Sequence, residues 1–196
     1  MKKFVVFEGI DGSGKSTVSR RVYEELEMRG YDAILTHEPF NEEIKRLIEE
    51  IMEKGGDPFS VTLLFLVDRI EHSKRIKEWL DQGKIVVCDR YEDSTYAYQS
   101  VQLNGLIEDP VKYLKSIISD RIVHPDRVYI LDIDPEIALS RIGRDRRPRG
   151  FEEREFLAKV RKNYIKLAKG ERYRIIDGRK RIDDIVDECL KDILGE

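Results

Sequence analysis

Short apolar runs alternate with longer mixed segments along the whole chain. Each run is only a few residues long and is bounded by polar residues, a pattern typical of strands buried in a sheet. We expect five strands, at Lys3–Phe7, Ala33–Thr36, Ile85–Cys88, Val128–Ile133 and Tyr173–Ile176.

The segments between these runs have the length and the mixed composition of helices. We expect helices near residues 17–29, 41–53, 60–81, 93–102, 109–120, 135–142, 152–168 and 181–194. Strands that alternate with helices join through right-handed crossovers into a parallel sheet that carries helices on both faces. The predicted fold class is therefore α/β, with a five-stranded parallel sheet flanked by helices. Ligands of such a fold bind beyond the carboxyl ends of the strands.

Residues 9–16 read Gly-Ile-Asp-Gly-Ser-Gly-Lys-Ser and connect the first predicted strand to the first helix. In this setting, glycines allow successive backbone N–H groups to form a nest for phosphate oxygens. Lys15 can reach the β- and γ-phosphates of a nucleotide, and Ser16 can ligate Mg²⁺. The alternative is a glycine-rich turn with an exposed lysine, which the strand–loop–helix context disfavours. A dinucleotide fingerprint does not fit, since Thr17 stands where its third glycine would be.

The motif predicts a three-layer P-loop NTPase fold that uses ATP as phosphoryl donor together with Mg²⁺. The ATP-binding residues that we expect are Gly9, Ile10, Asp11, Gly12, Ser13, Gly14, Lys15, Ser16 and Thr17.

Composition narrows the class of protein further. The chain has 196 residues, 40% hydrophobic and 38% charged residues, and a net charge of −3. This is the profile of a soluble globular chain, and we expect one domain spanning residues 1–196 and neither nucleic acid nor membrane as a partner. The first apolar run is too short for a signal peptide or a membrane span. Cys88 and Cys189 have no metal-ligand spacing and predict buried thiols in a reducing cytoplasm.

An aspartate and an arginine, Asp89 and Arg90, follow the apolar run that ends at Cys88. P-loop proteins use an aspartate at this position to hold Mg²⁺. Many ATPases place a water-orienting glutamate next, whereas Arg90 offers bidentate donors to phosphoryl oxygens and cannot act as a base. The pair therefore favours phosphoryl transfer over hydrolysis. A structural ion pair between the two residues is the alternative.

Five arginines gather in residues 141–149, where glycine and proline interrupt any continuous helix. We expect a lid at about residues 142–152 that closes over the triphosphate and excludes water. A solvated charged surface and a nucleic-acid contact are the alternatives. The catalytic candidates in this segment are Arg144, Arg146, Arg147 and Arg149.

Two further segments are ambiguous on spacing alone. Phe65 and Arg69 are four residues apart, so they share one helix face and could bind a base. Spacing alone favours Phe65 as a core residue and Arg69 as a surface charge. Residues 94–99, Ser-Thr-Tyr-Ala-Tyr-Gln, could line a nucleoside pocket or form an ordinary amphipathic helix.

Taken together, these motifs are similar to those of the thymidylate kinase family over nearly the whole chain. The resemblance rests on residues 7–17, on Asp89-Arg90-Tyr91-x-x-Ser94-x-x-Ala97-Tyr98-Gln99, on Leu64-Phe65-x-x-x-Arg69 and on Phe156-x-x-x-Val160-Arg161-x-x-Tyr164. It implies transfer of a phosphoryl group from ATP to dTMP in the pathway to dTTP, Mg²⁺ at Ser16 and Asp89, and a homodimer. The apolar residues 61–67 could supply the two-fold interface.

The resemblance also implies roles at the acceptor. Phe65 would stack on thymine, Arg69 would contact its O4, and Thr95 would lie near N3. Tyr98 would lie beside the sugar and disfavour a 2′-hydroxyl. Asp11 would approach the acceptor sugar, and Arg90 would bridge the acceptor phosphate and the transferred group. The full acceptor set that we expect is Asp11, Glu38, Phe65, Arg69, Arg90, Thr95, Tyr98 and Gln99.

Gly12 stands where some members carry a catalytic arginine, and the family's other arrangement, which this chain fits, places the catalytic arginines in the lid. The chain departs from the family pattern in two places. His37-Glu38-Pro39-Phe40 replaces the common Arg-Glu-Pro-Gly, so the arginine and the glycine are missing. The lid lacks the glutamate that often follows its Asp-Arg pair.

Two other functions remain open. One is a kinase of the same architecture that acts on another nucleoside monophosphate or on a deoxynucleoside. The other is a nucleotide-hydrolysing switch, which is disfavoured because the chain has no Asn-Lys-x-Asp motif and no predicted strand that ends in Asp-Glu.

Overall fold

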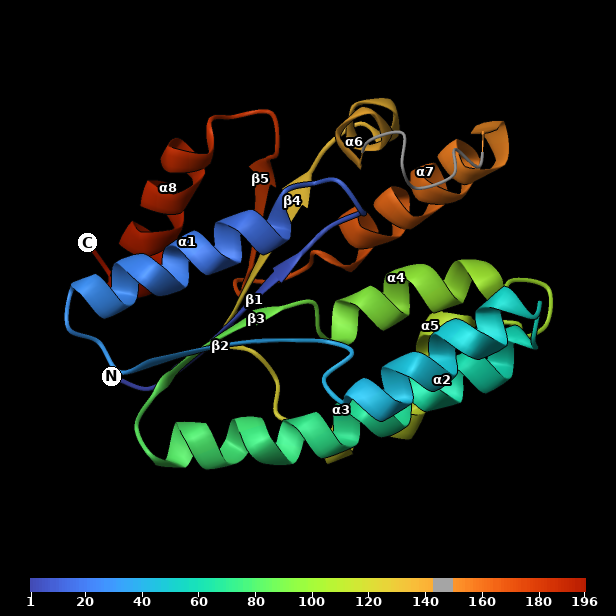
Figure 1. Cartoon of the computed structure of the whole chain (residues 1–196), viewed down its shortest axis with the longest axis horizontal. Coiled ribbons are helices and arrows are strands. Elements are labelled where there is room, and N and C mark those ends of the chain that lie inside the picture. The colour runs from blue at the N-terminus through green and yellow to red at the C-terminus, as the bar shows by residue number, and fades with distance from the viewer. Residues whose placement is uncertain (143–149) are drawn as a thin grey trace.

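Five parallel strands form one sheet with helices on both faces (Figure 1). The structure is a computed structural model that describes residues 1–142 and 150–196, with the backbone alone for residues 150–152. The strands are β1 (Lys3–Glu8), β2 (Ala33–His37), β3 (Ile85–Asp89), β4 (Arg127–Asp132) and β5 (Tyr173–Asp177), in the order β2-β3-β1-β4-β5. The predicted α/β fold and all five strands are confirmed, with ends that shift by one residue.

The helices lie close to the predicted segments. They are α1 (Lys15–Met28), α2 (Glu42–Glu53), α3 (Pro58–Asp81), α4 (Glu92–Gln102), α5 (Pro110–Ile118), α6 (Pro135–Ile142), α7 (Gly150–Leu167) and α8 (Ile182–Leu194). Asn41 and Asp57 fix the starts of α2 and α3, because each side chain accepts hydrogen bonds from two backbone N–H groups of the first turn. The prediction for α5 was too long, since residues Ser119–Arg121 form a 3₁₀ turn.

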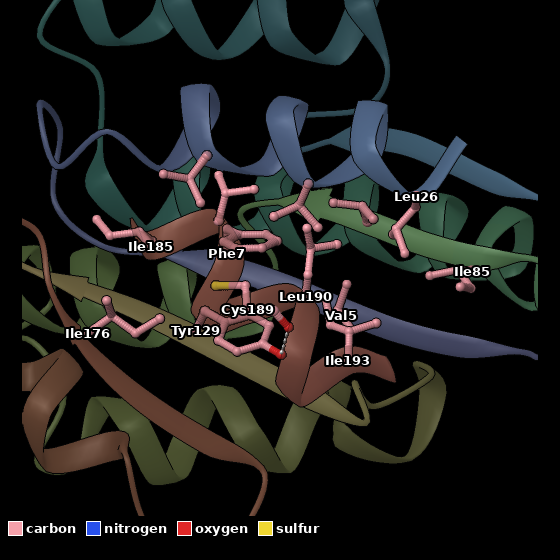
Figure 2. Close-up of a cluster of buried hydrophobic side chains, with 14 of the residues drawn as sticks. Val5, Phe7, Leu26, Ile85, Tyr129, Ile176, Ile185, Cys189, Leu190 and Ile193 are labelled. Atoms are coloured by element: carbon pink, nitrogen blue, oxygen red, sulfur yellow. Dashed lines mark hydrogen bonds between the residues drawn. The ribbon is translucent and has the colours of Figure 1, made fainter. Parts of the chain in front are cut away.

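Neighbouring residues of the central strand face opposite layers. Val5 and Phe7 of β1 pack with residues of α1 and α8, whereas Phe4 and Val6 pack with residues of α3, α4 and α7. Figure 2 shows the first of these two clusters, with Cys189 and Leu190 of α8 against the sheet. Because both faces are covered, the central strands β1, β3 and β4 are apolar along most of their length rather than alternating, as expected for a parallel sheet.

Strand register brings the polar strand ends together. Asp89 of β3 lies opposite both Phe7 of β1 and His37 of β2. The loop after β1, residues 38–40 after β2 and Arg90 after β3 therefore share one edge of the sheet. Both cysteines are buried free thiols. Within the described part of the chain, no helix is long and apolar enough to cross a membrane.

Candidate active site

The loop between β1 and α1 has backbone conformations that glycine favours. Gly9, Gly12 and Gly14 have φ angles of 144°, 81° and 94°. A Cβ atom on Gly9 would lie 2.8 Å from the carbonyl oxygen of Leu131, so a side chain would collide with β4. Within this loop Ile10 belongs to the core, Ser13 is buried, and Ser16 and Thr17 are exposed in the first turn of α1. The predicted strand–loop–helix arrangement is present.

Lys15, the first residue of α1, is a buried cation. Its Nζ lies 3.7 Å from Oδ1 of Asp11, too far for a hydrogen bond. Burial, together with the nearby charge of Arg90, lowers the pKa of Lys15 to about 8. An anionic ligand would stabilise the charged form, because an opposite charge within a few ångströms favours it. Lys15 is therefore arranged for a ligand that carries negative charge.

Asp89 presents a carboxylate oxygen that nothing in the described protein satisfies. Its Oδ1 is buried and has no hydrogen-bond partner there. A buried carboxylate oxygen without a partner is costly unless a ligand completes its coordination. Oxygen ligands suit Mg²⁺, which usually takes only one or two of them from protein and the rest from phosphates and water. Asp89, together with the exposed Ser16 hydroxyl, therefore fits a magnesium–nucleotide site.

No all-protein metal cage accompanies this pair. Within residues 1–142 and 150–196, no three His, Cys, Asp or Glu side chains gather so as to hold a metal ion.

Arg90 points toward the phosphate-binding loop rather than toward its neighbour Asp89. Its Nη2 donates to Oδ1 of Asp11 at 2.6 Å, and its Nη1 donates to the carbonyl oxygen of Gly9 at 3.3 Å. The guanidinium also lies over the ring of Tyr98, 5.1 Å from its centre. The φ angle of Arg90 is 70°, the only positive value at a non-glycine position in the described residues. The alternative of an Asp89–Arg90 ion pair is therefore wrong.

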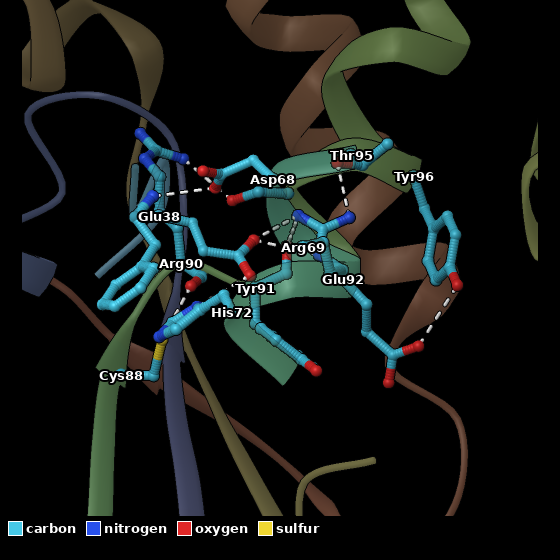
Figure 3. A network of polar contacts seen from close by, with 12 residues as sticks. Glu38, Asp68, Arg69, His72, Cys88, Arg90, Tyr91, Glu92, Thr95 and Tyr96 are labelled. Atoms are coloured by element: carbon cyan, nitrogen blue, oxygen red, sulfur yellow. Dashed lines mark hydrogen bonds and ion pairs between the residues drawn. The ribbon is translucent and has the colours of Figure 1, made fainter. Parts of the chain in front are cut away.

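Arg69 is fully buried and forms a dense polar network (Figure 3). Its Nε and Nη2 donate to Oε2 of Glu38 at 2.9 and 2.5 Å, Nη1 donates to Oγ1 of Thr95 at 2.7 Å, and Nη2 donates to the carbonyl oxygen of Tyr91 at 2.9 Å. The attraction of Glu38 outweighs burial and raises the pKa of Arg69 further. The interpretation from spacing alone, a surface charge, is wrong.

One cavity of about 680 Å³ joins these groups. It is lined by all eight residues of the predicted acceptor set: Asp11, Glu38, Phe65, Arg69, Arg90, Thr95, Tyr98 and Gln99. Five elements or loops contribute them, so the structure brings together the residues that the motifs predicted. The individual roles of these residues stay predictions.

Comparison with known proteins identifies the family. The sequence model of thymidylate kinase matches residues 7–189. Probable thymidylate kinases from Methanosarcina mazei, Sulfurisphaera tokodaii and Pyrobaculum aerophilum are 37%, 40% and 41% identical to the chain over 196, 193 and 197 residues. These alignments cover 97–98% of the chain and 95–97% of the relatives. The chain belongs to the thymidylate kinase family. It is accordingly a phosphotransferase.

Contacts in the structure explain Gly12 and Phe40, two positions at which other thymidylate kinases carry a different residue. A Cβ atom on Gly12 would lie 2.2 Å from the carbonyl oxygen of Ala138, so this loop excludes an arginine there. Phe40 stacks on His72 with ring centres 4.3 Å apart and meets the edge of Trp79, and neither Phe40 nor the exposed His37 lines the cavity. These two substituted residues therefore do not replace the missing phosphate contact within the cavity.

The catalytic arginines that we expected in the thymidylate kinase lid, Arg144, Arg146, Arg147 and Arg149, lie outside the described residues.

Several cavity residues were not among the predicted site residues, although Ser94 belongs to the segment 94–99 that could line a nucleoside pocket. They are Pro39, Met52, Ser94, Gln102, Glu153, Phe156 and Leu157. Ser94 and Phe156 belong to the thymidylate kinase motifs quoted above, which is the signal that could have found them. Met52 and Gln102 lie in the last turns of α2 and α4, whose sequence gives no such indication.

Proposed function

We propose that this enzyme transfers the γ-phosphoryl group of ATP to dTMP and produces ADP and dTDP. The observation that carries the proposal is the single cavity that runs from Arg90, beside the phosphate-binding loop, to Phe65, Arg69 and Thr95. A nucleoside monophosphate carries a phosphate and a base, so it matches a cavity whose lining includes both a cation beside the phosphate-binding loop and the aromatic ring of Phe65.

The hydrogen-bond inventory of Arg69 supports recognition of a pyrimidine carbonyl. A guanidinium has five N–H donors. Four of them are directed at Glu38, Thr95 and the carbonyl oxygen of Tyr91. Within the described residues the fifth, on Nη1, makes no such contact and can donate to a ligand, and O4 of thymine is an acceptor. Because the partners of Arg69 are buried, the remaining donor has a fixed position.

Thr95 supports the same selection. Its Oγ1 accepts a hydrogen bond from Arg69 and retains a second lone pair. The N3–H group of thymine can donate to that lone pair. Cytosine reverses both groups, with an amino donor at C4 and an acceptor at N3, so it would place a donor against the donor of Arg69. We therefore expect dTMP to be preferred over dCMP.

Tyr98 supports selection of a deoxyribose. Its hydroxyl accepts a hydrogen bond from the backbone N–H of Asp11 at 3.0 Å, which ties the ring to the phosphate-binding loop. A ring held in this way leaves no adjustable space beside the sugar. We propose that it disfavours a 2′-hydroxyl.

Transfer itself requires positioning more than proton chemistry. The acceptor phosphate is already ionised and needs no general base. Lys15 and Arg90 would offset the charge on the reacting phosphates, and preorganised charges of this kind lower the barrier without reorganisation during the reaction. Asp89 and Ser16 would hold Mg²⁺, which would neutralise phosphate charge when bound.

A panel of acceptors tests the proposal. ADP formation from ATP and Mg²⁺ is measured with dTMP, dUMP, dCMP, dAMP, dGMP, UMP, thymidine and no acceptor. Turnover that strongly favours dTMP supports the proposal. Preference for another acceptor would retain the phosphate chemistry and overturn the base assignment. ADP release without any acceptor would indicate hydrolysis.

We also propose that the enzyme is a cytoplasmic homodimer. Leu63 and Val67 lie one turn apart on α3 and are 43% and 49% exposed, so they form an apolar strip that a second copy could cover. The free thiols of Cys88 and Cys189 suit a reducing compartment. Sedimentation of the wild type and of Leu63→Glu/Val67→Glu at micromolar concentration tests the dimer. A monomeric wild type would contradict it.

A further inference from the structure

Glu8, the last residue of β1, is a fully buried carboxylate that the proposed reaction does not use. Its Oε1 accepts from the backbone N–H groups of Tyr91 and Ser94 at 2.8 and 3.1 Å. Its Oε2 accepts from the hydroxyls of Ser94 and Tyr164 at 2.6 and 3.0 Å. Burying a carboxylate is costly unless hydrogen-bond donors compensate for the lost water, and Glu8 has four such donors. An apolar side chain would fill this position without that cost, so packing alone does not explain Glu8.

The two hydroxyls connect this carboxylate to Arg90. Nη1 of Arg90 lies 3.0 Å from Oγ of Ser94 and 3.5 Å from the hydroxyl oxygen of Tyr164. The two hydroxyl oxygens also lie 2.9 Å from each other. An ionised carboxylate can only accept, so a hydroxyl that bonds to Glu8 uses its single hydrogen there. Lone pairs of both oxygens are then available to Arg90, which can only donate. Glu8 therefore sets the orientation of the hydroxyls that Arg90 requires.

The opposite charges of Glu8 and Arg90 also attract each other. Burial raises the pKa of Glu8, while the hydrogen bond from Ser94 and the positive charge of Arg90 act in the opposite direction. Glu8 and Tyr164 are among the groups that keep the pKa of Arg90 well above its usual value despite burial. The carboxylate and the guanidinium thus stabilise each other through two intervening hydroxyls.

The contacts of Arg90 leave part of the guanidinium free for a ligand. Nη1 is directed at Gly9, Ser94 and Tyr164, and one hydrogen of Nη2 is directed at Asp11. Nε–H and the second hydrogen of Nη2 take part in none of these four contacts. Two N–H groups match the bidentate recognition of phosphoryl oxygens by arginine. Fixing Nη1 therefore fixes where these two donors point.

We propose that Glu8, Ser94 and Tyr164 form a positioning group that orients the Arg90 guanidinium toward the phosphoryl group in transfer. The proposal rests on the proposed role of Arg90 in phosphoryl transfer. The three residues come from β1, α4 and α7, so the packing of these three elements determines the orientation of the Arg90 side chain.

Steady-state kinetics of Glu8→Gln and Tyr164→Phe test the proposal. Glu8→Gln puts an amide donor among the hydroxyls, and Tyr164→Phe removes one hydroxyl without changing the ring. Because small misplacements of a catalytic group cost up to about 100-fold, we expect kcat to fall about 100-fold in Glu8→Gln and about 10-fold in Tyr164→Phe, with KM for dTMP changed much less. Wild-type kcat in a folded Tyr164→Phe would overturn the proposal.

Tyr129→Phe is the matched control. Tyr129 is also buried, but its hydroxyl donates to Asp192 at 2.8 Å on the opposite face of the sheet. Both tyrosine variants should lower the urea midpoint, and only Tyr164→Phe should lower kcat. An equal fall of kcat in the two variants would indicate a general structural effect and overturn the positioning role.

Measuring kcat in an Arg90→Lys background tests whether the positioning group acts through Arg90. If the group acts through Arg90, adding Tyr164→Phe to Arg90→Lys should cost less than about twofold in kcat, because directly coupled residues are non-additive. A full additional 10-fold loss would overturn the proposal. Near-wild-type turnover in Arg90→Ala would instead remove the role of Arg90 on which it rests. An inactive Arg90→Ala beside fully active Tyr164→Phe would overturn the positioning group alone.

Discussion

Oε2 of Glu38 and Nη2 of Arg69 form an ion pair of 2.5 Å in which both side chains are almost completely buried. Glu38 also contacts Nδ1 of His72 through Oε1 at 3.0 Å, and His72 in turn contacts Thr36. Since a carboxylate only accepts, Nδ1 of His72 carries the hydrogen of this contact. Arg69, the residue that the resemblance assigns to the base, is therefore held by Glu38, and His72 holds Glu38 in turn.

Removing the charge of Glu38 should destabilise the fold as well as the site. Glu38→Gln leaves Arg69 buried with its charge unpaired, and breaking a buried pair in this way costs about 3–5 kcal/mol. Urea unfolding measures the loss. Glu50→Gln is the control, because Glu50 pairs with Lys54 on the surface, where both side chains are more than half exposed, and such pairs contribute about 0–1 kcal/mol. Equal losses in the two variants would contradict the structural role of the buried pair.

Thr95→Val should weaken recognition of thymine. The variant removes the acceptor of Arg69 and the expected partner of N3–H, and an unsatisfied buried donor costs about 1–3 kcal/mol. We expect KM for dTMP to rise about 10- to 100-fold and the preference over dCMP to shrink. Thr62→Val is the control: Thr62 is equally buried, and its hydroxyl donates to the carbonyl oxygen of Pro58 within α3. An unchanged preference in Thr95→Val would count against the base assignment.

ATP binding should depend on pH through Lys15. Its pKa of about 8 means that the ammonium is present below that pH and is lost above it. Bound phosphates stabilise the ammonium, so ATP affinity should fall as the pH rises through about 8, and binding at about pH 8.5 should take up a proton.

Titration calorimetry in two buffers of different ionisation enthalpy detects this proton. At about pH 8.5, where the phosphates of ATP are fully ionised, the two observed enthalpies should differ in the wild type. At the same pH, Lys15→Met should show no such difference. Identical enthalpies for the wild type at this pH would rule out the linkage.

Lys15→Ala should retain the fold and lose most of the activity. Removing one preorganised positive donor from a reacting centre costs about 10²–10³ in kcat. The assay is dTDP formation, with circular dichroism as the check on folding. Lys74→Ala is the control, because Lys74 pairs with Glu71 on the exposed surface of α3. Near-wild-type turnover in Lys15→Ala would remove this residue from the mechanism.

Much of the fold and the cavity could be predicted because the signals are local. The phosphate-binding loop is a contiguous motif, and the apolar runs identify the strands almost to the residue. Register then follows from the parallel sheet, which explains why Asp11, Glu38 and Arg90 meet. Each of these three residues follows a strand of the parallel sheet, so its place in the sequence already indicates its place at the edge of the sheet.

The buried polar networks could not be predicted from spacing. Arg69 looks like a surface charge in its helix, and only the tertiary position of Glu38 makes its burial favourable. Glu8 and Tyr164 are 156 residues apart and meet because β1 and α7 pack together. Phe40, which replaces a family glycine, is explained by the ring of His72 beneath it. Such contacts depend on which elements become neighbours, and local patterns do not encode that.

Transfer of the γ-phosphoryl group to dTMP is the central claim, and following that group tests it most directly. The enzyme is incubated with Mg²⁺, dTMP and ATP radiolabelled on its γ-phosphate, and the labelled products are separated by chromatography. The account predicts that the label appears in dTDP and that little inorganic phosphate forms with or without dTMP. Label that accumulates as inorganic phosphate, or in the products of another nucleotide in preference to dTDP, would contradict it.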